Sequence, residues 1–206
     1  MQRLAALVVT VLSMTACSSP AASIAPVVLF YGEATDPIGD TASFGDTRVA
    51  LPADLVFAAA EVTDDAVRLA VRFAPGSLDP RSTGAMILLD TDLDAATGVP
   101  NFGVGAEYVV TLEATLLGGA TLGRAVTDPG CEGSNPAIPC RFETVAHGLV
   151  GVGNDEMNTT IPRSAFGPLD GPLNFRVIAY AVLDDGHLTV TSDHMPNATD
   201  QFIAVR

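Results

Sequence analysis

The chain has 206 residues, and 48% of them are hydrophobic, so it can bury the core of one sizeable domain and does not have the composition of a disordered chain. Its 24 acidic residues outnumber 10 basic residues, all of them Arg, and the formal net charge is −14. This surface repels phosphate, so we expect no nucleic-acid partner and no basic membrane-binding patch. The acidity suits either cation binding or solubility alone.

Residues 1–16 have the pattern of a signal peptide, in which the apolar stretch Leu4–Met14 is too short to span a bilayer. Two small residues then precede Cys17. This arrangement resembles the lipobox of bacterial lipoproteins, although Met14 stands where that family usually has Leu. The resemblance implies a lipid on Cys17 and anchoring to the outer face of a bacterial membrane. The alternative is an ordinary secretory signal cut at Ala16 or later.

We expect residues 17–26 to be a flexible tether and residues 27–206 to be one domain. Short runs of β-branched and apolar residues, separated by Gly, Pro and Asp, predict strands rather than helices. The predicted strands are Asp54–Val62, Ala66–Phe73, Met86–Leu89, Glu107–Leu112, Phe142–Val145, Met157–Ile161, Leu173–Leu183, Leu188–Thr191 and Phe202–Val205.

Hairpin turns are predicted at Thr63–Asp65 and Asp184–Gly186, and a short helical turn at Pro162–Phe166. Within Ala66–Phe73, apolar residues alternate with Arg and Ala, which predicts one buried and one wet face. The continuous apolar run Met86–Leu89 predicts a central strand. Many short strands without a long amphipathic helix favour an all-β antiparallel sandwich, immunoglobulin-like or jelly-roll-like.

Cys131 and Cys140 lie in a loop rich in Gly, Ser, Asn and Pro. In an oxidising compartment, two cysteines so close in one loop are expected to form a disulfide. A zinc site is the alternative, but two cysteines without neighbouring His ligands make a poor one.

An acidic run follows the predicted central strand, with carboxylates at Asp90, Asp92 and Asp94. Alternate carboxylates can converge where a chain leaves a strand and curls, and calcium prefers six to eight oxygen ligands. Glu107 is a flanking candidate, as is Asp36 or Asp40 if the fold brings either near. Magnesium demands stricter geometry, and the absence of nearby His or Cys argues against zinc. The other interpretation is a solvated turn whose Asp side chains cap backbone amides.

Seven segments in order resemble a bacterial surface β-sandwich of the carbohydrate-binding family 9-like or DOMON-like type. They are DPIGDT (36–41), ADLVFAAAEV (53–62), LLDTDLDAATGVPN (88–101), GAEYVV (105–110), TTIPRSAFG (159–167), LNFRVIAYAV (173–182) and SDHMPN (192–197). The resemblance implies two antiparallel sheets and a sugar or haem as ligand.

The residues favour a non-catalytic binding or structural module of the cell envelope, with a glycan or another envelope protein as partner. The three His are scattered, and no catalytic motif is present, so a hydrolytic enzyme is a remote alternative. Trp is absent and Tyr is rare, which disfavours tight sugar binding. The alternative is a haem-binding electron-transfer module, for which His187, His194 and Met195 are the available ligands.

Overall fold

The computed structural model describes residues 25–44, 53–101, 104–114, 119–126, 141–182, 190–197 and 201–206. The strands in these residues are β1 (Val28–Thr35), β2 (Ala42–Phe44), β3 (Leu55–Thr63), β4 (Ala66–Phe73), β5 (Thr83–Asp90), β6 (Val99–Asn101), β7 (Val104–Ala106), β8 (Tyr108–Glu113), β9 (Gly119–Val126), β10 (Arg141–Val152), β11 (Glu156–Pro162), β12 (Leu173–Val182), β13 (Val190–Met195) and β14 (Ile203–Val205). The helical structure in this part of the chain is one 3-10 turn, η1 (Arg163–Phe166). No helix there is long and apolar enough to span a membrane.

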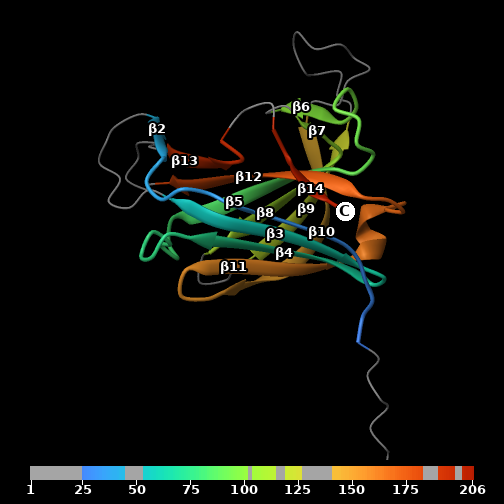
Figure 1. Ribbon diagram of the computed structural model, residues 1–206, viewed down its shortest axis with the longest axis horizontal. Helices are drawn as coiled ribbons and strands as arrows, with labels where there is room; N and C mark the ends of the chain where they lie inside the picture. Colours follow the sequence, from blue (N-terminus) through green and yellow to red (C-terminus); the bar gives the residue numbers. More distant parts are fainter. Residues whose placement is uncertain are drawn as a thin grey trace, which may run out of the picture.

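The strands form one antiparallel 12-stranded sheet in the order β1-β3-β4-β11-β10-β9-β8-β5-β12-β13-β2, with β14 paired to β12. The sheet curls into a nearly closed, barrel-like shape. Its first strand meets the C-terminus, where Tyr31 and Arg206 exchange backbone hydrogen bonds of 3.1 and 3.2 Å. Figure 1 shows β2 and β13 at one end of the molecule, and the separate β6–β7 hairpin towards the other.

Strand β10 connects two parts of the curved sheet, because it pairs with a different strand along each part of its length. Its residues from Arg141 to Leu149 pair with β9, whereas those from Val150 to Val152 pair with β11. The register shifts between Thr144 and Ala146, and such a bulge bends a strand and increases its twist. The predicted all-β antiparallel class is therefore confirmed.

The core fills the space inside the folded sheet, and it explains the alternation read from the sequence. On β4, Val67, Leu69, Val71 and Phe73 are at most 1% exposed, whereas the residues between them are half-buried or exposed. Strand β5 lies between β8 and β12 and is buried over almost its whole length, as expected of a central strand.

Most predicted strands are present, with some shifts at their ends. The turn Thr63–Asp65 joins β3 to β4, and Thr63 Oγ1 accepts a 3.0 Å hydrogen bond from the Ala66 amide. The structure adds β1, β2, β6, β7 and β9, and it extends the predicted strand Phe142–Val145 to the 12 residues of β10. The predicted turn Asp184–Gly186 lies outside the described residues.

Candidate metal centre

The loop after β5 folds back on itself through its own acidic side chains. Asp92 Oδ1 accepts a 3.0 Å hydrogen bond from the Asp94 amide, and Asp94 Oδ1 accepts one of 3.0 Å from the Ala96 amide. Both are Asx-type contacts that stabilise turns. Leu93 also adopts a positive φ of 62°, a conformation uncommon for a side-chain-bearing residue.

Gly98 allows the loop to come close to the start of β8. Its φ is 62°, and a Cβ there would lie 2.5 Å from the Ala106 backbone and 2.7 Å from Glu107 Oε1. A larger residue would therefore push the loop away from Glu107. The preceding Thr97 uses this proximity, because its Oγ1 lies 2.9 Å from Glu107 Oε1 and also bonds Asp92.

Three carboxylates converge where the loop meets the sheet. Asp90 at the end of β5, Asp92 in the loop and Glu107 before β8 each place an oxygen within 4.8 Å of the other two. Asp90 is 2% exposed. Its Oδ2 accepts a 3.3 Å hydrogen bond from Asn174 on β12, whereas its Oδ1 is buried and has no hydrogen-bond partner in the described ranges. The cluster thus contains an unsatisfied, deeply buried acceptor.

Burial makes the ionised form of these carboxylates unfavourable when no cation is bound. Burial raises the pKa of Asp90, and this effect exceeds the lowering caused by hydrogen bonds from the Asn174 amide and from nearby backbone amides. Burial likewise raises the pKa of Glu107 against hydrogen bonds from Thr91 and Thr97. The negative charge of Asp92 raises both pKa values further, and no basic group in the described part of the chain contributes to either shift. A cation would supply the missing positive charge.

The chemistry of the donor set fits a hard cation. Its oxygen atoms are the ligands that calcium and magnesium take, and it contains no sulfur or imidazole ligand that would select zinc. The cluster could therefore hold a metal ion such as calcium.

Of the four residues that the sequence proposes as ligands, the structure brings together Asp90, Asp92 and Glu107. Asp94 instead serves the turn, because its side chain caps Ala96 and its carbonyl oxygen accepts a 3.0 Å hydrogen bond from the Thr97 amide.

A cleft of about 740 Å³ opens beside the cluster. Asp92 and Glu107 line one part of it, and Arg124 on β9 and Asp170 after η1 line others. Tyr108 also borders the cleft, but it is 8% exposed and donates its hydroxyl hydrogen to the Phe166 carbonyl oxygen. It therefore belongs to the core and does not form an open aromatic platform.

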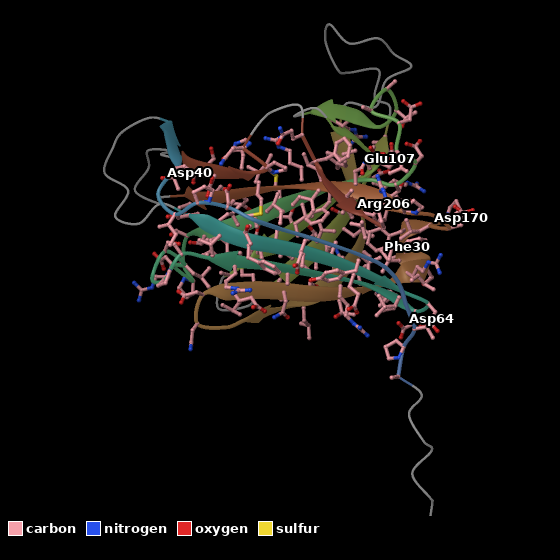
Figure 2. All side chains as sticks on the ribbon, in the orientation of Figure 1. Phe30, Asp40, Asp64, Glu107, Asp170 and Arg206 are labelled. Carbon is pink, nitrogen blue, oxygen red and sulfur yellow. The ribbon has the colours of Figure 1, made fainter. Side chains whose placement is uncertain are left out.

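The fold does not bring Asp36 or Asp40 to this loop. Both belong to a second group with Asp193 on β13, whose ligand oxygens also lie within 4.8 Å of one another. Figure 2 shows Asp40 and Glu107 towards opposite ends of the molecule. The reason is topological: the β1–β2 connection runs to the edge formed by β13 and β2, away from the end of β5. We did not predict Asp193 as a ligand. An acidic residue inside a strand is the signal that could have identified it, but the predicted strand Leu188–Thr191 ended before it, whereas β13 continues to Met195.

The residues predicted for the lipid anchor, the disulfide and the haem alternative lie partly outside the described ranges. Cys17, Cys131, Cys140 and His187 lie outside the described residues. Met195 is 1% exposed in the hydrophobic core, and burial lowers the pKa of the half-buried His194. Adjacent residues on a strand point to opposite faces, so His194 and Met195 cannot both face one haem iron.

No protein-family model matches this chain, and no curated protein matches it.

Proposed function

We propose that this chain is an exported, non-catalytic binding or structural module of the bacterial envelope, in which calcium at Asp90, Asp92 and Glu107 fixes the loop beside a ligand-binding cleft. The observation that carries the calcium proposal is the buried Oδ1 of Asp90, which lacks a hydrogen-bond partner and belongs to a group of three carboxylates. Buried charges in proteins are normally paired or bound to metal.

Calcium fits this site better than magnesium does. Calcium accepts carboxylates, backbone carbonyls and water in a flexible shell of six to eight oxygens, whereas magnesium requires near-ideal octahedral geometry. Three side chains from a strand end, a curled loop and the start of another strand supply such an irregular set. Backbone carbonyls or water would complete the shell.

The cleft is the proposed ligand site, and its volume lies within the range of roughly 300–1,000 Å³ typical of small-molecule sites. Arg124 and Asp170 offer polar contacts, as a glycan or an envelope partner would require. The glycan part of the proposal is supported by the resemblance to carbohydrate-binding family 9-like domains, and the envelope location by the lipobox-like sequence at Cys17.

We also propose that the sheet forms a sandwich, either immunoglobulin-like or jelly-roll-like. Its support is that β10 pairs with β9 along one part and with β11 along another, so the sheet has two halves that enclose the core.

Thermal unfolding tests the calcium site. An ion that binds only the folded chain stabilises it by about 2.7 kcal/mol at a hundredfold excess over Kd, so melts in millimolar calcium and in chelator should differ by several degrees. Asp90→Asn should reduce the difference by the contribution of this site. Asp94→Asn is the matched control, because it removes one charge from the same loop while leaving the cluster intact, and it should preserve the difference. Coincident melts of the unmodified protein would reject the site.

Two screens test the functional class. A glycan array probed in calcium and in chelator should reveal binding that depends on calcium and is weakened by Arg124→Ala. A screen against glycosides, esters and peptides should show no turnover. Turnover that persists through purification and disappears with one carboxylate substitution would overturn the non-catalytic assignment.

A further inference from the structure

A second group of carboxylates lies at the other end of the molecule and comes from three segments of the chain. Asp36 and Asp40 belong to the connection between β1 and β2, Asp54 precedes β3, and Asp193 lies on β13. Oxygens of Asp36, Asp40 and Asp193 lie within 4.8 Å of one another. Asp54 adjoins them, because its Oδ2 accepts a 2.9 Å hydrogen bond from the amide of Gly39.

The group contains buried oxygens without partners. Asp54 is 6% exposed, and its Oδ1 has no hydrogen-bond partner. Oδ2 of Asp36 is also buried and has no partner. Carboxylate oxygens removed from water in this way are unfavourable unless a donor or a cation satisfies them.

The carboxylates of this group also raise one another's pKa. Burial, followed by the charges of Asp40 and Asp54, raises the pKa of Asp36 to about 6. Burial and the charges of Asp36 and Asp40 raise the pKa of Asp193 to about 7, although backbone amides lower it. Among the described residues, no basic group contributes to either shift.

The backbone holds Asp193 in position. Its Oδ2 accepts a 2.6 Å hydrogen bond from the Leu55 amide, and its Oδ1 accepts one of 2.8 Å from the His194 amide. Asn197 approaches from the same segment, with its Nδ2 3.0 Å from Asp36 Oδ1 and 2.6 Å from Asp40 Oδ2. The oxygen and the nitrogen of a side-chain amide occupy nearly the same space. Rotation of the Asn197 amide by half a turn would therefore present its oxygen to an ion.

We propose that Asp36, Asp40 and Asp193, with Asp54 beside them, form a second, separate cation site that binds calcium and joins the β1–β2 connection to β3 and β13. Beyond the grouping of the carboxylates, the Oδ1 of Asp54 supports this site, because it has no hydrogen-bond partner among the described residues and belongs to a side chain that is more than nine-tenths buried and adjacent to Asp36 and Asp40. The ligands are oxygen atoms, so the site selects a hard divalent cation.

The position of this site gives it a structural role. Strands β1 and β2 lie at opposite ends of the strand order, and the chain between them carries Asp36 and Asp40. An ion that is bound there and also by Asp193 on β13 connects the two borders of the sheet to each other. The hydrogen bonds between Tyr31 and Arg206 connect β1 to the C-terminal segment elsewhere along the same strand. The ion therefore closes the barrel-like sheet at the β2–β13 end.

Calcium titration by isothermal calorimetry on the purified protein tests the site and separates it from that of Asp90. We expect two bound ions in the unmodified protein, one in Asp90→Asn, one in the double variant Asp36→Asn and Asp40→Asn, and none when all three changes are combined. One ion that Asp90→Asn removes would overturn this proposal and leave the proposed function standing. One ion that only the double variant removes would do the reverse. An absence of binding would overturn both.

Hydrogen exchange of the unmodified protein provides a test that does not depend on whether a variant folds. Calcium should slow amide exchange at least about tenfold in residues 36–44 and at the start of β3, relative to chelator. The matched control segment is residues 146–149 of β10, which contribute no ligand to either cluster and should not respond. Equal exchange of residues 36–44 in calcium and in chelator would overturn the proposal.

Discussion

The metal-free protein should lose stability as the pH rises from acid to neutral, mainly because of Asp193. This side chain is 2% exposed, and burial with two neighbouring carboxylates raises its pKa from 3.8 to about 7. A carboxyl group whose pKa is higher in the folded than in the unfolded chain stabilises the fold fully below the unfolded pKa. That contribution is lost as the pH rises through the folded pKa. For Asp193 the window extends from about pH 4 to about pH 7.

The magnitude follows from the difference between the two pKa values. Roughly 3 pH units at about 1.4 kcal/mol per unit give about 4 kcal/mol, an upper bound because Asp193 shares its proton equilibrium with Asp36. Asp36, with its pKa raised to about 6, contributes in the same direction. His194 contributes in the opposite direction, because its lowered pKa favours the neutral form and costs stability only below its unfolded value of 6.5.

Urea unfolding in chelator at several pH values measures this dependence. The free energy of unfolding should fall between about pH 4 and about pH 7, and Asp193→Asn should flatten the slope because it cannot ionise. Glu143→Gln, an exposed site on β10, is the matched control and should leave the slope unchanged. Saturating calcium should remove or reverse the fall, because the ion binds the ionised carboxylates. Stability in chelator that rises with pH over this range would refute the reasoning.

Three further predictions concern the loop, the core and the anchor. Gly98→Ala should destabilise the protein by about 1–3 kcal/mol in urea unfolding and weaken calcium binding, because its Cβ would collide with the Ala106 backbone. Gly119→Ala is the control and should change little, because the space around its Cβ is open. Equal effects of the two substitutions would contradict this prediction. Leu112→Ala, at a fully buried position, should cost about 2–5 kcal/mol in the same assay, whereas Leu149→Ala, at a position 84% exposed, should change stability by no more than about 0.5 kcal/mol. Cys17→Ser should release the protein from the membrane fraction and abolish acyl labelling; unchanged fractionation would argue against the anchor.

Local pattern predicted the strands that it specifies strongly. The alternation from Val67 to Phe73 and the apolar run at Met86–Leu89 correspond to β4 and β5, because one-sided or complete burial leaves a direct trace in the sequence. Strand β9, with the sequence Gly-Ala-Thr-Leu-Gly-Arg-Ala-Val, carries no such trace. Its small residues have low β propensity, and its conformation depends on pairing with β8 and β10.

The two acidic clusters differ in the same way. Asp90, Asp92 and Glu107 could be associated from the sequence because they flank one loop and its short hairpin. Asp193 could not be associated with Asp36, since more than 150 residues separate them and only the order of the strands brings them together. The individual role of Asp94 also depended on which way the turn directed its side chain.

The most direct test of the central claim is a crystal structure of the protein grown in millimolar calcium, with anomalous scattering used to locate the ion. We expect an anomalous peak within roughly 2.3–2.6 Å of carboxylate oxygens of Asp90, Asp92 and Glu107, and no such peak at this site in a crystal of Asp90→Asn. Well-ordered carboxylates at these positions with no anomalous peak between them would contradict it.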